Sequence, residues 1–245
     1  MTAPVPRRSA LVTGAARNIG RATAIQLARQ GLDVVVHTRQ DESTAAEVVA
    51  AVEQLGVRGR LVTADLTDSD AVSRMVEQVG QVDVLVNNAA SRPHRPFLDV
   101  DLQEWRSVFA ITVEAPYVLC RAVLPGMRDR GWGRIVSMTG VRAQMGAAGR
   151  ASSSAAKHAL IGLTRSLAHE FGEDGVTANA VCPGTVMTDR DAADPQRMKE
   201  RKGIGALGRL GQPEDVAAVV GFLVSDAGAY VTGQTLGANG GELMI

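Results

Sequence analysis

The sequence predicts an α/β fold, a doubly wound parallel sheet with helices on both faces, in one domain that covers residues 1–245. Short apolar segments with the character of buried strands alternate with amphipathic segments of helical period along the whole chain, a pattern typical of such sheets. The chain has 245 residues, of which 45% are apolar, and it shows no linker or repeat. These properties fit a single dinucleotide-binding domain rather than two domains.

Residues 10–20, ALVTGAARNIG, predict a phosphate-binding loop. An apolar strand ends at Thr13-Gly14, and a helix begins at Ile19-Gly20 and runs to Gly31. A helix N-terminus behind a glycine turn presents unpaired N–H groups and the positive end of a dipole, which suits a pyrophosphate. A second strand, Asp33–Thr38, completes a βαβ unit at the N-terminus.

Expected strands and helices continue to alternate along the rest of the chain. The expected helices cover residues 43–55, 69–79, 101–127, 153–171 and 213–225. The expected strands cover residues 58–63, 82–86, 133–138, 176–182 and 234–238. Thr67 and Asp70 are expected to cap the helix at 69–79. Residues 141–151 read as a small-residue loop, and residues 187–208 as a mobile substrate lid.

Composition narrows the class of protein. With 26 basic and 26 acidic side chains, the chain has no electrostatic footprint for nucleic acid or an anionic membrane. We recognise neither a membrane span nor a signal peptide, so we expect a cytoplasmic protein. Cys120 and Cys182 lack metal-ligand spacing; buried free thiols are therefore favoured over a disulfide, and no metal site is predicted.

Six ordered motifs resemble those of the short-chain dehydrogenase/reductase family, particularly its ketoacyl-carrier-protein reductase-like members. The matching segments are Thr13-Gly14 with Ile19-Gly20, Asp65, Asn87-Asn88-Ala89-Ala90, Asn179–Gly184, Gly233-Gln234-Thr235 and Asn239-Gly240-Gly241. The resemblance implies a Rossmann-type fold with a seven-stranded parallel sheet and a nicotinamide cofactor across the strand ends. It also implies a small-molecule substrate and a homo-oligomer, a dimer or a tetramer, of which we expect the homotetramer.

By the same resemblance, the cofactor-binding residues are Gly14, Arg17, Asn18, Ile19, Gly20, Arg39, Asp65, Leu66, Asn88, Ala89, Lys157, Pro183, Gly184 and Val186. NADP(H) is favoured because the second strand ends in His37-Thr38-Arg39 without an acid, while Arg17 lies in the phosphate loop. The alternative is that both arginines are solvated surface groups. Asn18 replaces a family glycine, and asparagine tolerates the left-handed backbone that the loop needs.

The family's catalytic Asn, Ser, Tyr and Lys correspond to Thr112, Gly140, Ser153 and Lys157 in this chain. Only the lysine is kept. A serine hydroxyl is far less acidic than a tyrosine phenol and shorter by a ring, so Ser153 is a poor substitute. In the family, the lysine also binds the nicotinamide ribose, so Lys157 can serve cofactor binding without catalysis.

Three groups are candidates for the missing proton donor. Lys157 is the first, and Ser153 with its serine neighbours could hold a water beside it. His94 is the third, because its pKa suits acid–base chemistry near neutral pH, although a loop histidine is commonly a solvated surface group. Arg142, Arg150 and Arg190 are either binders of an anionic substrate or ordinary surface charges.

Three functions therefore stay open. The first is a non-standard NADPH-dependent oxidoreductase acting on CH–OH and C=O groups. The second is a catalytically inactive homologue that binds NADPH or regulates an active partner. The third is a non-redox enzyme, such as a dehydratase, an isomerase or a lyase, on the same fold. Apolar residues around the expected site, Val141, Met145 and Met187, either line a pocket for a small or aliphatic carbonyl compound or simply pack the lid.

Overall fold

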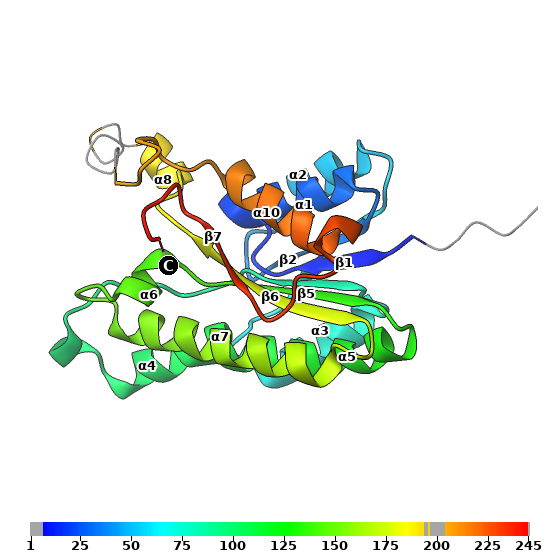
Figure 1. The fold of residues 1–245 in the computed structure, drawn as a ribbon, viewed down its shortest axis with the longest axis horizontal. Helices are drawn as coiled ribbons and strands as arrows, with labels where there is room; N and C mark the ends of the chain where they lie inside the picture. The colour runs from blue at the N-terminus through cyan, green and yellow to red at the C-terminus, as the bar shows by residue number, and fades with distance from the viewer. Residues whose placement is uncertain (1–6, 194–195, 197–203, 245) are drawn as a thin grey trace, which may run out of the picture.

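A computed structural model describes residues 7–193, 196 and 204–244, and one parallel sheet runs through them (Figure 1). Its strands are Ser9–Val12 (β1), Asp33–Thr38 (β2), Gly59–Thr63 (β3), Val84–Asn87 (β4), Gly133–Met138 (β5), Val176–Pro183 (β6) and Thr235–Ala238 (β7). The strand order is β3-β2-β1-β4-β5-β6-β7. The predicted seven-stranded, doubly wound Rossmann-type sheet is therefore confirmed.

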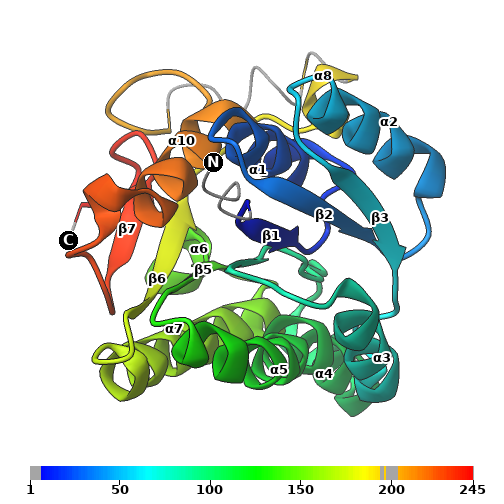
Figure 2. The same cartoon turned by 90° about the vertical axis from the view of Figure 1, so that its right-hand side faces the viewer.

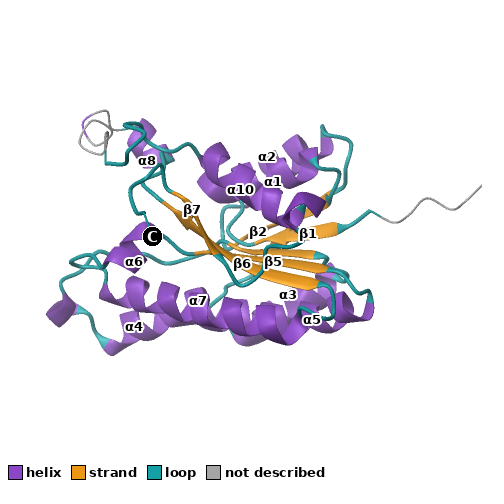
Figure 3. Cartoon of the chain, viewed as in Figure 1, coloured by secondary structure: helices purple, strands orange, loops and turns teal. Residues whose placement is uncertain are grey.

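Helices cover both faces of this sheet, as Figures 2 and 3 show. The helices are Asn18–Arg29 (α1), Glu42–Glu53 (α2), Ser69–Val79 (α3), Leu102–Phe109 (α4), Ala115–Asp129 (α5), Val141–Met145 (α6), Ala151–Phe171 (α7), Asp189–Ala192 (α8) and Pro213–Val224 (α10). Helices α1, α2 and α10 lie on one face, and α3, α4, α5 and α7 lie on the other (Figure 2). The molecule is a three-layer sandwich.

Successive residues of the central strands pack into two separate hydrophobic cores, one on each face of the sheet. On β1, Ala10 and Val12 pack into the core under α1 and α10, whereas Leu11 packs into the core under α3 and α5. Successive side chains of a strand point to opposite faces of the sheet, and both faces are buried here. This is why the central strands read as continuous apolar runs.

Local hydrogen bonding corrects the predicted cap of α3. The helix has the expected bounds, Ser69–Val79, but Asp68 is its N-cap, and its carboxylate accepts from the N–H groups of Asp70 and Ala71. Thr67 instead binds Asp65 through its own N–H and hydroxyl. The prediction that Thr67 and Asp70 form the capping box is wrong, since Asp68 occupies the N-cap position, from which its carboxylate reaches both donors.

Two further segments differ from the expected elements. The long helix expected at residues 101–127 is interrupted by a π-helical turn, Ala110–Glu114 (η2), between α4 and α5. The segment expected as a loop at 141–151 contains the short helix α6. Both departures lie at the carboxyl edge of the sheet, where the backbone must position a site rather than fill a core.

The run Leu102–Asp129 is long and apolar enough, by length and composition, to cross a membrane. This corrects the expectation that the chain has no such segment. Its residues Leu119 and Met127 are fully buried against the sheet, and the run includes the π-turn. We therefore interpret it as the core helix of the second face.

Candidate active site

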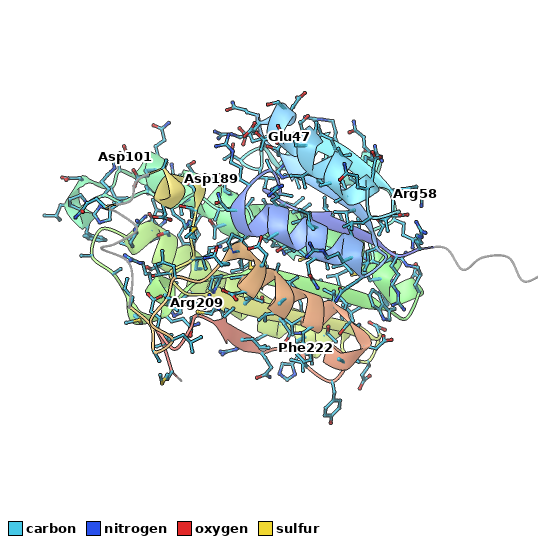
Figure 4. The ribbon with its side chains drawn as sticks, turned by 90° about the horizontal axis from the view of Figure 1, so that it is seen from above. Glu47, Arg58, Asp101, Asp189, Arg209 and Phe222 are labelled. Carbon is cyan, nitrogen blue, oxygen red and sulfur yellow. The ribbon has the colours of Figure 1, made fainter. Side chains whose placement is uncertain are left out.

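The site lies at the carboxyl edge of the sheet, between β1 and β4, where the strand order reverses direction. Ligands of open α/β sheets bind in the crevice at such a switch point. In Figure 1 this edge carries α6, the start of α7 and α8. Figure 4 shows Asp101, Asp189 and Arg209 near this end of the molecule, and Arg58 at the opposite end.

The loop after β1 has the close backbone packing that a phosphate cradle requires. Gly14 has a positive φ of 62°, which favours glycine. A Cβ on Gly20 would lie 2.2 Å from the Gly14 carbonyl oxygen and 2.6 Å from Asn88 Nδ2. The loop therefore leaves no room for a side chain at Gly20 and packs directly against the first turn of α1. A helix N-terminus that follows such a turn suits a pyrophosphate. In this respect the described residues fit a dinucleotide.

Asn88 clamps this loop to the end of β4. Its side-chain amide donates to the carbonyl oxygens of Thr13 and Gly14 at 2.9 and 3.0 Å. The Thr13 hydroxyl in turn accepts from the N–H groups of Asn88 and Ala89 at 3.0 and 3.1 Å. Two segments far apart in the sequence thus form one rigid floor, as the predicted cofactor role of Asn88 and Ala89 requires.

His37 is a site residue that the sequence analysis did not single out. Its Nδ1 accepts from the N–H of Gly14, and its Nε2 lies 3.1 Å from the Ala64 carbonyl oxygen. The ring is 1% exposed, and burial lowers its pKa. His37 is therefore neutral with the proton on Nε2, and it ties the glycine loop to the ends of β2 and β3. A lone polar residue in an apolar strand, DVVVHT, was the available signal.

Asn18 adopts a left-handed backbone, with a φ of 49°, and is the one non-glycine residue with a positive φ in the described part of the chain. This confirms that asparagine can replace the glycine there. Asn18 also forms a reciprocal pair of hydrogen bonds with Asp189, at 3.0 and 3.4 Å, so the first turn of α8 contacts the phosphate loop. The neighbouring Ile19 packs partly buried against the core.

The predicted ribose end of the site holds more charge than expected. Arg17 donates to the Asp41 carboxylate, with Nε 2.7 Å from Oδ2, and hydrogen bonds from Thr44 and Arg17 lower the pKa of Asp41. Arg39 lies at an exposed position near Asp65, whose pKa is lowered first by hydrogen bonds from Thr67 and further by the Arg39 charge. Arg17 is thus not an isolated surface cation. Its ion pair with Asp41 must break before Arg17 can bind a 2′-phosphate.

Behind these residues, the end of β6 closes the opposite side of the crevice. Pro183 ends the strand, and the Gly184 N–H donates to the Ala238 carbonyl oxygen on β7. A Cβ on Gly184 would lie 2.8 Å from Asn239 Cα, so glycine is required there. Val186 pairs with Gly211 in an isolated bridge. Leu66, which follows β3, is buried in the core under α3.

Lys157 lies on α7 with only 6% of its surface exposed. Its ammonium group donates to the Met138 carbonyl oxygen at the end of β5. Burial, and to a smaller extent the positive charge of Arg92, together lower the pKa of Lys157 to about 7. The lysine can therefore gain or lose a proton near neutral pH.

Ser153, Thr112 and Gly140 are the residues that the resemblance aligns with the family's catalytic Tyr, Asn and Ser. Ser153 is one helical turn before Lys157, and its hydroxyl donates to the Arg150 carbonyl oxygen at 3.2 Å. Thr112 is buried in the π-turn η2, and its hydroxyl lacks a hydrogen-bond partner among the described residues. A Cβ on Gly140 would meet nothing closer than the Pro183 carbonyl oxygen, at 3.8 Å.

His94 is exposed on the loop after β4, and its ring packs against Gly149. That contact brings it near the start of α7, so it borders the site, but no interaction joins it to Lys157 or Ser153 in the described residues. The two cysteines are free and buried, as predicted. Within the described ranges, no group of three or more His, Cys, Asp or Glu residues is placed to hold a metal ion.

Comparison with known proteins agrees with this geometry. A family model described as enoyl-(acyl carrier protein) reductase matches residues 14–242. A 3-oxoacyl-(acyl-carrier-protein) reductase from Pseudomonas aeruginosa is 40% identical over 240 residues, which cover 96% of this chain and 97% of that protein. A 3-oxoacyl-(acyl-carrier-protein) reductase from Synechocystis is 38% identical over 244 residues, with 96% and 97% coverage.

Solved structures of similar proteins superpose on this chain over nearly its whole length. A protein described as a candidate NAD(P)-dependent gluconate 5-dehydrogenase from Beutenbergia cavernae, with NADP at low occupancy, superposes with a TM-score of 0.89 at 38% identity over 96% of both chains. A blue fluorescent protein from a metagenomic library, in complex with NADPH, superposes with a TM-score of 0.90 at 37% identity over 97% of this chain and 98% of that one. The chain belongs to the short-chain dehydrogenase/reductase family.

Proposed function

We propose that this chain binds NADP(H) across the carboxyl edge of its sheet and reduces a small carbonyl compound, or oxidises the matching alcohol, with Lys157 as the proton-carrying group. The observation that supports the proposal most is Lys157 itself, a buried amine whose pKa of about 7 suits proton transfer at neutral pH.

The described residues fit NADP(H) at three places. The glycine loop and the N-terminus of α1 suit the pyrophosphate, because the loop turns at Gly14 and packs against the first turn of the helix. Arg17 and Arg39 would hold a 2′-phosphate, and Asn88 keeps the loop in shape. Two relatives of similar fold are described with NADP or NADPH bound. When bound, NADPH supplies a hydride.

The chain's own contribution is to hold the carbonyl and supply the proton. The protonated Lys157 amine gives a proton to the oxygen of the carbonyl group as that oxygen gains negative charge. Ser153 lies four residues earlier on the same face of α7, so its hydroxyl could relay the proton where the amine does not reach. The neutral amine accepts the proton in the reverse direction.

The missing groups predict a slow enzyme. Gly140 has no hydroxyl to orient the carbonyl, and a positioned general acid typically contributes a factor of 10²–10⁴ to the rate. A lysine whose pKa lies near neutral pH recovers part of that factor. Holding the cofactor and the substrate in the right orientation supplies the remaining rate enhancement. We expect turnover well below that of relatives with a complete set of catalytic residues.

The experiment follows NADPH oxidation with a panel of small ketones and aldehydes, using the wild type and Lys157→Met. We expect the variant to lose at least 100-fold in kcat, and calorimetry should show a change in the NADPH Kd of less than tenfold. His158→Gln, an exposed neighbour on α7, serves as the control and should retain the rate. Wild-type turnover that survives Lys157→Met would overturn the assignment of the proton.

A second candidate is an NADPH-binding protein without turnover. It is favoured by the lack of a hydroxyl at Gly140 and by the buried Thr112 hydroxyl without a partner among the described residues. The triple variant Thr112→Asn, Gly140→Ser, Ser153→Tyr separates the two, since a serine fits the space at Gly140. Reductase activity in the triple variant but not in the wild type would favour an NADPH-binding protein without turnover. Substrate conversion without a net change in NADPH would indicate a non-redox enzyme.

We propose that residues 187–208, of which 194–195 and 197–203 lie outside the described residues, form a lid over the substrate. We also propose that the protein is cytoplasmic and that it assembles into dimers or tetramers. We propose the homotetramer as the assembled state. Sedimentation at micromolar protein concentration tests it, and a monomer there would contradict it.

A further inference from the structure

We propose that Asn18 and Asp189 form a latch that closes the strap, residues 186–191, over NADP(H) in the crevice and slows its release. The strap follows β6, whereas Asn18 belongs to the phosphate loop after β1. Asn18 stands where the resemblance places a glycine, which has no side chain to form this contact. The inference rests on the proposed function only for the place of the cofactor, and not for Lys157 or a substrate.

The latch spans the crevice because its two residues follow strands that are not neighbours. In the sheet, β4 and β5 lie between β1 and β6. A contact between the loop after β1 and the segment after β6 therefore passes over the carboxyl ends of both intervening strands. Figure 2 shows α8, which begins within the strap, displaced from β6 toward α1 and α2. A ligand at the switch point would lie beneath this contact.

Two reciprocal hydrogen bonds make the latch. The Asp189 N–H donates to Asn18 Oδ1 at 3.0 Å, and Asn18 Nδ2 donates to the Asp189 carboxylate at 3.4 Å. The side-chain amide of Asn18 thus uses its acceptor and its donor on the same partner, which fixes its orientation. Asn18 is half-buried and Asp189 is exposed, so water competes for the pair and the latch can open. The side chain of the neighbouring Arg190 lies outside the described residues.

The strap is also held close to β6, where it begins. Val186 forms an isolated bridge with Gly211. The N–H and the hydroxyl of Thr188 both donate to the Asp191 carboxylate, at 2.9 and 2.6 Å, and Asp191 is fully buried. The strap therefore presents Asp189 to the phosphate loop from a hydrogen-bonded turn.

The latch should act on the release of the cofactor more than on its entry. A dinucleotide beneath the closed strap leaves only after both hydrogen bonds are broken, whereas it enters while the strap is open. Loss of the latch should therefore raise the dissociation rate of NADPH and leave the association rate nearly unchanged. Because the opening of such segments limits turnover in many enzymes, the latch would also limit how fast the spent cofactor is exchanged.

The test measures NADPH release by stopped-flow fluorescence, after the complex of the intact protein is mixed with excess NADP+. Asn18→Gly removes both bonds, and glycine favours the positive φ of this position, so the loop keeps its path. We expect release to accelerate at least fivefold, since one net hydrogen bond is worth a factor of about five. Asp189→Ala removes only the bond to the carboxylate and should accelerate release about two- to fivefold. Asp189→Asn keeps an acceptor oxygen and should not accelerate it.

A double variant separates the latch from a general loosening of the phosphate loop. In the Asn18→Gly background, Asp189→Ala should accelerate release by less than about 1.5-fold, because its partner is already absent. Hydrogen exchange gives a second measurement: the Asp189 amide should be protected in the wild-type NADPH complex and lose that protection in Asn18→Gly. Asp226→Ala, at an exposed acid in the 3-10 helix Asp226–Gly228 (η3), is the matched control and should leave release unchanged.

Unchanged release in Asn18→Gly, or effects of the two substitutions that multiply, would overturn the latch. An unprotected Asp189 amide in the wild-type complex would overturn it as well, and this measurement needs no variant to fold. A latch that retains NADPH in a protein that reduces no carbonyl compound would refute the proposed reductase function and leave the latch standing. Failure of NADPH to bind would overturn the cofactor role and the latch together.

Discussion

Replacing His37 by leucine should loosen the phosphate loop and destabilise the protein. The change removes two hydrogen bonds of the buried ring, from the Gly14 N–H and to the Ala64 carbonyl oxygen, both at 3.1 Å. Each such bond contributes about 1 kcal/mol net, and a partner left unsatisfied costs roughly 1–3 kcal/mol. Since Gly14 is half-buried, water can satisfy part of that loss. We expect a total of about 3 kcal/mol, which lowers the Tm by roughly 6–12 °C in a chain of this size.

Calorimetry and urea denaturation measure this loss of stability. Titration with NADPH measures the effect of the substitution on the phosphate loop. The variant should also bind NADPH at least tenfold more weakly, because the loop's conformation is no longer fixed. His158→Leu is the matched control, since His158 is exposed and bonds only within its own helix among the described contacts. A loss below 1 kcal/mol, or one equal to that of the control, would refute the reasoning.

The stability of the protein should also depend on pH through His37. Burial lowers the pKa of His37 in the folded state, so the unfolded chain binds one proton more as the pH falls through the ordinary histidine range near 6.5. The stability that neutral His37 contributes is fully present above that range and decreases below it. His37→Leu should remove this part of the slope of stability against pH. An unchanged slope would contradict the assignment of a neutral, buried ring.

Three further predictions concern the cofactor and the proton. Gly20→Ala should abolish NADPH binding and destabilise the fold, because its Cβ would lie 2.2 Å from a carbonyl oxygen; Gly162→Ala, which meets nothing within 4 Å, should stabilise the protein slightly, and denaturation compares them. Asp41→Asn should tighten NADPH binding several-fold without improving NADH binding, since Arg17 is then released; equal gains for both cofactors in calorimetry would contradict this. Carbonyl reduction should slow as the pH rises through about 7, where Lys157 loses its proton, and alcohol oxidation should accelerate; a rate that is flat across this range would exclude Lys157 as the donor.

Much of the fold followed from the sequence because it depends on local patterns. The buried strands β2 and β5 have the predicted bounds, and the glycine loop, Asn88 and Lys157 meet at one edge as expected. Apolar runs bounded by turn residues fix such strands, and parallel connections then leave few possible topologies.

What the sequence did not reveal depends on contacts across the fold. His37 meets Gly14 only because β1 and β2 lie side by side, and Arg17 meets Asp41 because the loops after these strands converge. No pattern within either segment encodes such a contact. The cap at Asp68 was missed for a local reason: three polar residues follow one another, and backbone geometry decides which one reaches the free N–H groups.

The central claim is tested most directly by calorimetric titration of the protein, stripped of any cofactor, with NADPH and with NADH. The account predicts a Kd for NADPH in the micromolar range or tighter, and binding of NADH at least tenfold weaker, since we propose that Arg17 and Arg39 bind the 2′-phosphate that NADH lacks. Failure of either cofactor to bind would contradict it and leave a scaffold or a non-redox enzyme. Equal affinity for both would contradict the role given to the two arginines.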